Sequence, residues 1–569
     1  MTRASQETSE VRLQRAVFWL PLGLLAAFAL WLAVTRIYQV DEAQNLYMAK
    51  VIAMDQTGTY FSNALLWMLG PLSWLIRSVE DSASLFLAGR LLFLGLFCLN
   101  IWLLALATGV PLRSTAGRIA LLGAATLAPL WDYGFEIRHD NLILTGLLLI
   151  WWLGRARGGG IAEFAAIGFI TALLVFVAFK AFAYAVPLSA ALALFAPAGR
   201  GRRLRLLALW LGGVAAGAMV AVLAYRMSGL WGVFLAGLPG GGDAVAVAKA
   251  TRFGPGIALE RLLTQTPLLL GLAAGALLAF GRDLWRDRRR ALAWQGTAPE
   301  VLLALGALGA LWINPTPFPY NLVNLVPFLY LLAFRFAAPL CSTAPIDARY
   351  LALAAGIILF THIAPFASAT WRHLDWTNDR QVLLMRAAEA MTDPVKDPVY
   401  DAAGMVPTRQ SIGYHWYLHS LNMQAMLDGR IPTVAQMLVK NPAPVLIRSY
   451  RTDWLPESDR GFIAESYVPL ADDFLVLGRA LPAGGGTYQV VHPGRYRLFA
   501  LAEGALRDLP EATLDGQPLG EQPMALTTGP VEIRCPPEYQ PVMLWVGPKL
   551  RSPPDLGPGD HRRLFVNWY

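Results

Sequence analysis

Long apolar runs separated by short polar loops fill the chain from its start to about residue 370. A membrane-spanning helix needs roughly 20 mostly apolar residues, and most of these runs approach that length. Beyond this point, charged residues, prolines and short apolar segments alternate, as is typical of water-exposed domains. The pattern predicts about eleven transmembrane helices, near residues 16–35, 84–108, 119–135, 140–154, 161–179, 181–197, 206–225, 258–281, 299–313, 321–338 and 350–368.

The C-terminal third divides into two predicted regions after the membrane region, which covers residues 1–370. Residues 371–480 mix helical and extended patterns, with amphipathic helices expected at 379–391 and 433–440 and a buried strand at 445–447. Residues 481–569 carry short alternating segments separated by turn signals, which predicts a small β-sandwich. This sandwich would either bind a glycan or acceptor or serve only as a stabilising cap.

Composition supports the membrane assignment and excludes other classes. Hydrophobic residues make up 56% of the chain, charged residues make up 15%, and the mean hydropathy is +0.45. The net charge of +8 comes from short basic clusters between apolar runs, a distribution typical of membrane proteins rather than of nucleic-acid binding. With 3 cysteines, the sequence predicts neither a disulfide framework nor a zinc site.

The basic clusters also predict orientation, because Lys and Arg concentrate in cytoplasmic loops. The alternate loops that should face the cytoplasm are basic, which places the N-terminus in the cytoplasm and the C-terminal regions outside it. The first apolar run could be read as a signal peptide, but it lacks a clear cleavage site and is expected to be retained. Abundant Ala, Gly, Leu and Arg are typical of a GC-rich bacterium, so we expect a multi-pass inner-membrane protein with a periplasmic C-terminal part.

Unusual polar residues collect on the predicted outer side of the membrane. They follow the first span, join spans three and four, mark the turn between spans five and six, and interrupt the apolar pattern in a proline-rich segment at 314–321. The residues concerned are Asp41 and Glu42, then Glu136, Arg138, His139 and Asp140, then Lys180, and finally Tyr320.

Each motif alone has an ordinary explanation. Asp41 and Glu42 would suit a solvated helix end, Arg138 would neutralise Asp140 within a loop, and Lys180 would extend toward lipid headgroups. Together, however, carboxylates and cations on one face suit transfer of a sugar from a lipid phosphate. A carboxylate would take the proton of an acceptor hydroxyl, and cations would stabilise the departing phosphate.

The sequence resembles the GT-C glycosyltransferases, specifically the protein O-mannosyltransferases and the bacterial lipid A aminoarabinose transferases. The resemblance rests on Val40-Asp41-Glu42-Ala43 after span one, on Arg138-His139-Asp140-Asn141-Leu142 opening span four, and on the span pattern to about residue 370. It implies a polyprenyl-phosphate sugar donor and an inverting single displacement onto a lipid, glycan or protein acceptor.

The resemblance also implies roles for individual residues. Asp41 would be the base, and Glu42 would orient the acceptor or a neighbouring cation. Arg138, Asp140, Lys180 and Tyr320 are expected at the donor phosphate, with Glu136, His139 and Arg252 as further loop contacts. Arg252 belongs to a glycine-containing outer loop that would either close over a substrate or act as a plain connector.

Two questions stay open at the level of the sequence. Asp41, Glu136, His139 and Asp140 would bind a divalent metal if their loops meet, but no dedicated ligand spacing is present, so no cofactor is assigned. The alternative function is transport or flipping of a lipid-linked substrate, which predicts a polar pathway through the membrane rather than charges gathered on one side.

Overall fold

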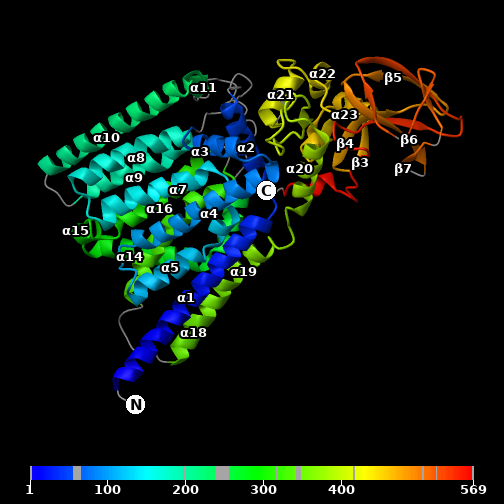
Figure 1. The fold of residues 1–569 in the computed structure, drawn as a ribbon. Coiled ribbons are helices and arrows are strands. Elements are labelled where there is room, and N and C mark those ends of the chain that lie inside the picture. Colours follow the sequence, from blue (N-terminus) through cyan, green and yellow to red (C-terminus); the bar gives the residue numbers. More distant parts are fainter. Residues whose placement is uncertain are drawn as a thin grey trace.

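The computed structural model describes most of the chain. The described residues are 3–54, 66–196, 200–236, 255–314, 317–340, 348–413, 417–502, 505–509, 511–520 and 522–566. A helical bundle forms the N-terminal part, and a smaller region with helices and sheets projects from one end of it (Figure 1).

The bundle begins with α1 (Arg3–Thr35), α2 (Val40–Ala53), α3 (Leu66–Ser78) and α4 (Ser82–Ala107). It continues with α5 (Thr115–Ala125), α6 (Ala128–Tyr133), α7 (His139–Trp151), α8 (Ile161–Val177), the short helix η3 (Phe179–Ala181), α9 (Phe182–Phe195), α10 (Arg200–Met227) and α11 (Trp231–Ala236). The bundle also contains α13 (Gly256–Gln265), α14 (Pro267–Arg286), α15 (Arg288–Ala291), α16 (Ala298–Ile313), η4 (Pro319–Asn324), α17 (Val326–Leu340), α18 (Ala348–Ile358) and α19 (Ala364–Trp371). Two short helical segments, η2 (Trp152–Ala156) and η5 (Leu359–Ile363), follow α7 and α18.

Among the described residues, 6 helices are long and apolar enough to cross a membrane. They match predicted spans at 18–35, 82–107, 201–227, 267–286, 319–339 and 352–371, and shorter apolar helices occupy other predicted spans. The count of about eleven therefore stays a prediction. The run predicted at 258–281 is divided between α13 and α14, because Pro267 has no N–H for the helix ladder and begins a new helix.

The segment after the first span was not predicted to be helical, yet it forms α2. The Glu42 carboxylate accepts a hydrogen bond from the Gln39 backbone N–H at 2.9 Å, which satisfies a donor at the helix start. Ten of the residues of α2 are buried, Lys50 included. This helix therefore packs within the protein instead of forming a loop in solvent.

The outer region contains α20 (Asp379–Met391), α21 (Ser420–Leu427), α22 (Val434–Lys440) and α23 (Glu457–Ser466). Its strands are β1 (Val399–Tyr400), β2 (Val445–Ile447), β3 (Tyr467–Ala471), β4 (Phe474–Ala480), β5 (Gly485–Val490), β6 (Gly494–Ala502), β7 (Ala505–Asp508), β8 (Thr513–Leu514), β9 (Gln517–Pro518), β10 (Met524–Leu526), β11 (Gly529–Arg534) and β12 (Pro541–Trp545). The predicted helix at 379–391 and the strand at 445–447 are confirmed.

The strands form two sheets. One has 8 strands with the main order β1-β2-β4-β12-β6-β10, and the other has 4 strands in the order β5-β11-β8-β9. Tyr488 of the smaller sheet contacts Tyr496 of the larger one, with ring centroids 5.9 Å apart, so the sheets share a buried face. The boundary expected near residue 480 falls at the end of β4. Because β4 pairs with β12, residues from both sides of this boundary belong to one sheet.

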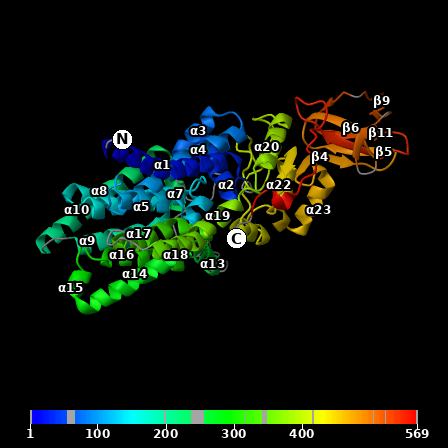
Figure 2. The ribbon, with the colours of Figure 1, turned by 90° about the horizontal axis from the view of Figure 1, so that it is seen from below.

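Two chain segments join the outer region to the bundle just beyond α1 and α19. Arg36 forms a β-bridge with Thr377, and the Ile37 N–H donates to the Trp376 carbonyl at 2.9 Å. The Tyr38 N–H donates to the Gln381 side chain at 2.7 Å. These bonds hold the start of α2 against α20, and Figure 2 shows the outer region projecting from the end of the bundle where α2 and α19 lie.

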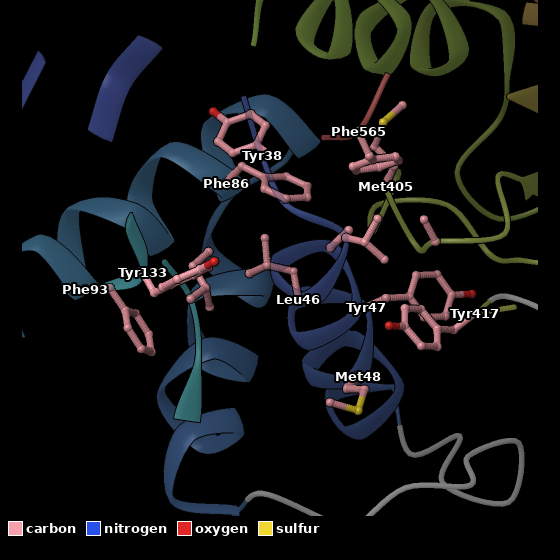
Figure 3. Close-up of a cluster of buried hydrophobic side chains, with 14 of the residues drawn as sticks. Tyr38, Leu46, Tyr47, Met48, Phe86, Phe93, Tyr133, Met405, Tyr417 and Phe565 are labelled. Carbon is pink, nitrogen blue, oxygen red and sulfur yellow. The ribbon is translucent and has the colours of Figure 1, made fainter. Parts of the chain in front are cut away.

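Apolar side chains complete the junction on both sides of α2. In Figure 3, Leu46 points toward α4 and Tyr133, whereas Tyr47 lies beside Tyr417 of the outer region. The Tyr47 hydroxyl accepts a hydrogen bond from the Ser411 N–H at 2.8 Å. The outer region is therefore packed directly against the helix that carries Asp41.

Candidate active site

Asp41 lies in the first turn of α2, at the junction of the bundle and the outer region. One of its oxygens accepts a hydrogen bond from the Tyr417 hydroxyl at 3.2 Å, and the other forms an ion pair with Arg138. The Asp41 side chain is 27% exposed. Burial opposes ionisation, but Arg138 and Arg451 outweigh it and lower the pKa of Asp41.

The loop before α7 places Arg138 opposite Asp41. Asn141 holds this loop by donating to the carbonyls of Tyr133 and Glu136 at 3.0 and 2.9 Å. Asn45 of α2 donates to the Ile137 carbonyl at 2.6 Å, which fixes the distance between helix and loop. The polar loop before the apolar helix α7 is thus ordered by side-chain amides that satisfy its backbone.

Arg138 reaches a second carboxylate and an aromatic ring. Its Nε lies 3.5 Å from Asp140, and its guanidinium carbon lies 4.0 Å from the ring centroid of Tyr320. Tyr320 comes from η4, in the proline-rich segment that interrupts the apolar pattern. A guanidinium over a ring face is stabilised by the negative face of the aromatic system.

Lys180 lies in η3, between α8 and α9, and its side chain contacts the same carboxylate and ring as Arg138. Its Nζ lies 2.5 Å from Asp140 and 5.0 Å from the ring centroid of Tyr320. The Lys180 side chain is 23% exposed, so the ammonium is accessible although it is paired. Asn324 also contacts Asp140, at 3.4 Å.

The structure therefore brings five predicted residues together from four separate segments. We call this group the Asp41 cluster, and its members are Asp41, Arg138, Asp140, Lys180 and Tyr320. His139 adjoins it, with Nε2 3.9 Å from Asp140 and a side chain that is 25% exposed. Arg252, with the rest of its glycine-containing loop, lies outside the described residues.

Glu42 and Glu136 belong to a different arrangement, which we call the buried scaffold. Its members are Arg36, Glu42, Arg90 and Glu136, and each of these side chains is 0% exposed. Arg90 of α4 binds both oxygens of Glu42 at 2.9 and 2.6 Å, and Arg36 binds Glu136 at 2.8 Å. Arg90 also donates to the Ile37 carbonyl at 2.6 Å.

This burial changes the interpretation of the two glutamates. The Glu42 carboxylate additionally accepts hydrogen bonds from the backbone N–H groups of Gln39 and Ile137, at 2.9 and 3.3 Å. With no exposed surface, Glu42 does not present a carboxylate to an acceptor, and of the two expected partners the structure shows a neighbouring cation, Arg90. Glu42 instead ties α2 to α4 and to the loop that carries Arg138.

Four residues of this region were not predicted from the sequence. Arg90 lies within a long apolar helix, where an arginine requires a buried partner, and this signal could have found it. Arg36 also adjoins a predicted span. Tyr417 and Arg451 come from the outer region, and Arg451 donates to the Tyr417 hydroxyl at 3.1 Å. No local pattern connects these two residues to Asp41.

Metal binding at the predicted residues receives no geometric support. Glu136 is engaged by Arg36, and Asp140 is engaged by Lys180 and Arg138. Among the described residues, the three-ligand grouping with metal-like spacing is Asp472, Asp560 and His561, in the outer region. There, however, His561 already pairs with Asp472 and Asp453. Metal dependence therefore stays an open prediction.

Comparison with known proteins gives distant structural likenesses. No family model and no curated protein matches the chain. The apo oligosaccharyltransferase of Archaeoglobus fulgidus is similar with a TM-score of 0.46 and 14% identity, over 90% of this chain and 77% of that one. The same archaeal protein tethered to an acceptor peptide gives 0.44 and 14%, over 82% and 73%. TM-scores below 0.5 do not establish a common fold, so no function follows from either likeness.

Proposed function

We propose that this protein is a membrane glycosyltransferase that moves a sugar from a polyprenyl-phosphate donor to an acceptor hydroxyl. The observation that carries the proposal is the Asp41 cluster. There, a partly exposed carboxylate adjoins Arg138, and Lys180 shares with Arg138 the carboxylate of Asp140 and the ring of Tyr320. The resemblance of the two polar motifs to the GT-C glycosyltransferases is consistent with this chemistry.

Asp41 would act as the base in a single displacement. Its lowered pKa keeps the carboxylate ionised near neutral pH, so it can accept a proton. The proton of the acceptor hydroxyl passes to Asp41 while the acceptor oxygen bonds to the anomeric carbon. The bond from that carbon to the phosphate oxygen breaks, and its electron pair leaves with the phosphate, which inverts the anomeric centre.

Arg138 and Lys180 would stabilise the departing phosphate. Both cations are already held in place by Asp140 and by the ring of Tyr320, so little reorganisation is needed when negative charge develops. Donor binding would replace part of the contact between Lys180 and Asp140 with a contact to phosphate. The glutamates of the buried scaffold would take no part in this step and would fix the geometry.

The location of the cluster suits a lipid-linked donor. Asp41 comes six residues after the span that ends at Thr35, and Asp140 lies in the first turn of the apolar helix α7. A site at the ends of membrane helices lies at headgroup depth, where the phosphate of a membrane lipid resides. The basic loops predict that this face lies outside the cytoplasm, which in a bacterium would be the periplasmic side of the inner membrane.

The proposal can be tested with purified protein reconstituted with polyprenyl-phosphate sugars and an acceptor-containing cell extract. Release of free polyprenyl phosphate would be measured for wild type, Asp41→Asn and the control Glu80→Gln, which alters an exposed carboxylate outside the cluster. We expect turnover in wild type and Glu80→Gln and its loss in Asp41→Asn. Absence of turnover with every donor would instead favour transport of a lipid-linked substrate.

A further inference from the structure

An apolar groove lies between α1, α4 and α5, and none of its lining residues belongs to the Asp41 cluster. Its volume is about 840 Å³. The α1 side of the groove runs from Phe18 to Ala29, and Phe97 and Trp102 of α4 form part of another wall. Trp19 and Trp102, which line the groove, are 60% and 47% exposed, so the groove is open at the outer surface of the helical bundle.

The dimensions of the groove match one leaflet of a membrane. A helix rises 1.5 Å per residue, so the stretch of α1 from Phe18 to Ala29 spans roughly 16 Å. Half of the hydrocarbon core measures about 15 Å. Trp131, which is 1% exposed, lines the groove and stacks with Phe28 at 5.6 Å, so this ring closes the end near Ala29.

The opposite end of the groove is positively charged. Arg113 and Arg118 line it, and the Arg118 guanidinium lies 5.9 Å from the ring centroid of Phe18. Neither arginine forms an ion pair with a carboxylate among the side chains that the structure describes. The remaining lining is mostly apolar, so the groove combines an apolar channel with a pair of cations at its mouth.

We propose that this groove binds an anionic phospholipid of the leaflet on the Arg113 side. One acyl chain would lie between α1 and α4, and the phosphate would contact Arg113 and Arg118. Arginines near a membrane surface attract anionic lipids, so the pair supplies a preference for a negatively charged headgroup. Because α1 lines one side of the groove, the lipid would also contact the helix that leads to Asp41.

Native mass spectrometry of the full-length protein, titrated with phosphatidylglycerol or phosphatidylcholine in detergent, tests this site. We expect wild type to retain one phosphatidylglycerol about tenfold more strongly than phosphatidylcholine. The double variant Arg113→Gln/Arg118→Gln should lose that preference. The control Arg288→Gln/Arg289→Gln, which alters exposed arginines of α15, should keep it.

Three further observations distinguish the sources of binding. Excess inorganic phosphate should not displace the lipid, because the acyl chain supplies much of the contact. Ala26→Phe, which fills the groove, should weaken retention of both lipids. If the double arginine variant does not fold, the single variant Arg113→Gln, at an exposed position, should show the reduced preference for phosphatidylglycerol instead. Equal retention of both lipids by wild type, or an unchanged preference in the arginine variants, would overturn the proposal.

Discussion

The Asp41 cluster and the buried scaffold are made of the same kinds of side chain, yet they differ in access to solvent. Both pair carboxylates with arginines, and both join α2 to the loop before α7. The four scaffold side chains are fully buried, whereas Asp41 and Lys180 are 27% and 23% exposed. Ion pairing alone therefore does not mark a site, and of these two groups only the Asp41 cluster is accessible to a substrate.

The contrast is sharpest between two adjacent residues. Asp41 and Glu42 occupy consecutive positions in the first turn of α2, and consecutive helical residues point about 100° apart. Asp41 consequently faces Arg138 and the outer region, while Glu42 faces Arg90 in the bundle. Glu42 fixes the position of α2, and Asp41 keeps a partly exposed carboxylate that can contact a substrate.

The largest expected effect comes from breaking the scaffold. Arg90→Met would leave Glu42 buried without its cation, and removal of one partner from a buried ion pair costs about 3–5 kcal/mol. The variant should lose most of its thermal stability in detergent, measured as the midpoint of aggregation on heating. The matched exposed variant Arg289→Met should keep the wild-type midpoint, and an unchanged midpoint in Arg90→Met would contradict the scaffold role.

Within the Asp41 cluster, loss of a phosphate-binding cation should act on turnover rather than on stability. Lys180→Met should lower the rate of polyprenyl phosphate release about 100-fold, since a preorganised donor to developing charge contributes on this scale. Its thermal midpoint should stay close to that of wild type because Lys180 is partly exposed. Lys180→Arg, which keeps the charge, should recover part of the activity. A normal rate in Lys180→Met would remove this residue from the site.

A smaller effect is expected at the contact between the cluster and the outer region. Tyr417→Phe removes a hydrogen bond to the Asp41 carboxylate, and bonds to charged groups contribute about 1.5–3 kcal/mol. We expect roughly a tenfold fall in turnover, with the pH dependence of the rate shifted upward because the lost bond favours the ionised form of Asp41. A pH profile identical to that of wild type would show that Tyr417 does not act through Asp41.

The smallest predicted effect concerns Lys50, at the far end of α2. Burial lowers the pKa of Lys50 to about 7, below its ordinary value in an unfolded chain. The unfolded state then binds more protons above pH 7, so stability should rise with pH through this window, by about 1 kcal/mol between pH 7 and 8. Lys50→Met should remove this part of the rise, as measured by thermal midpoints at both pH values. An equal rise in both proteins would exclude Lys50 as its source.

The sequence identified most helices of the bundle because apolar runs of membrane length are a strong signal. It also located the helix 379–391 and several strands, whose alternating patterns are local. It did not predict α2, because polar residues such as Asn45 and Lys50 resemble a loop in the sequence. In the structure these two side chains donate hydrogen bonds to the carbonyls of Ile137 and Arg409. Helix formation there depends on partners distant in the chain.

The site was predictable to a similar degree. Four polar segments were expected on one face, and the structure brings Asp41, Arg138, Asp140 and Lys180 together. The different roles of Asp41 and Glu42 were not predictable, since they depend on which face of α2 packs against Arg90. Tyr417 lies 376 residues from Asp41, and no sequence pattern links positions at that separation.

The most direct test compares Asp41→Asn with Glu42→Gln, measuring both polyprenyl phosphate release and thermal midpoint in the same preparations. We predict that Asp41→Asn keeps its midpoint and loses turnover by about 100-fold or more, the scale of general base catalysis. Glu42→Gln should show a clearly lowered midpoint, with residual turnover in the protein that remains folded. Wild-type turnover in folded Asp41→Asn would contradict the assignment of Asp41 as the base.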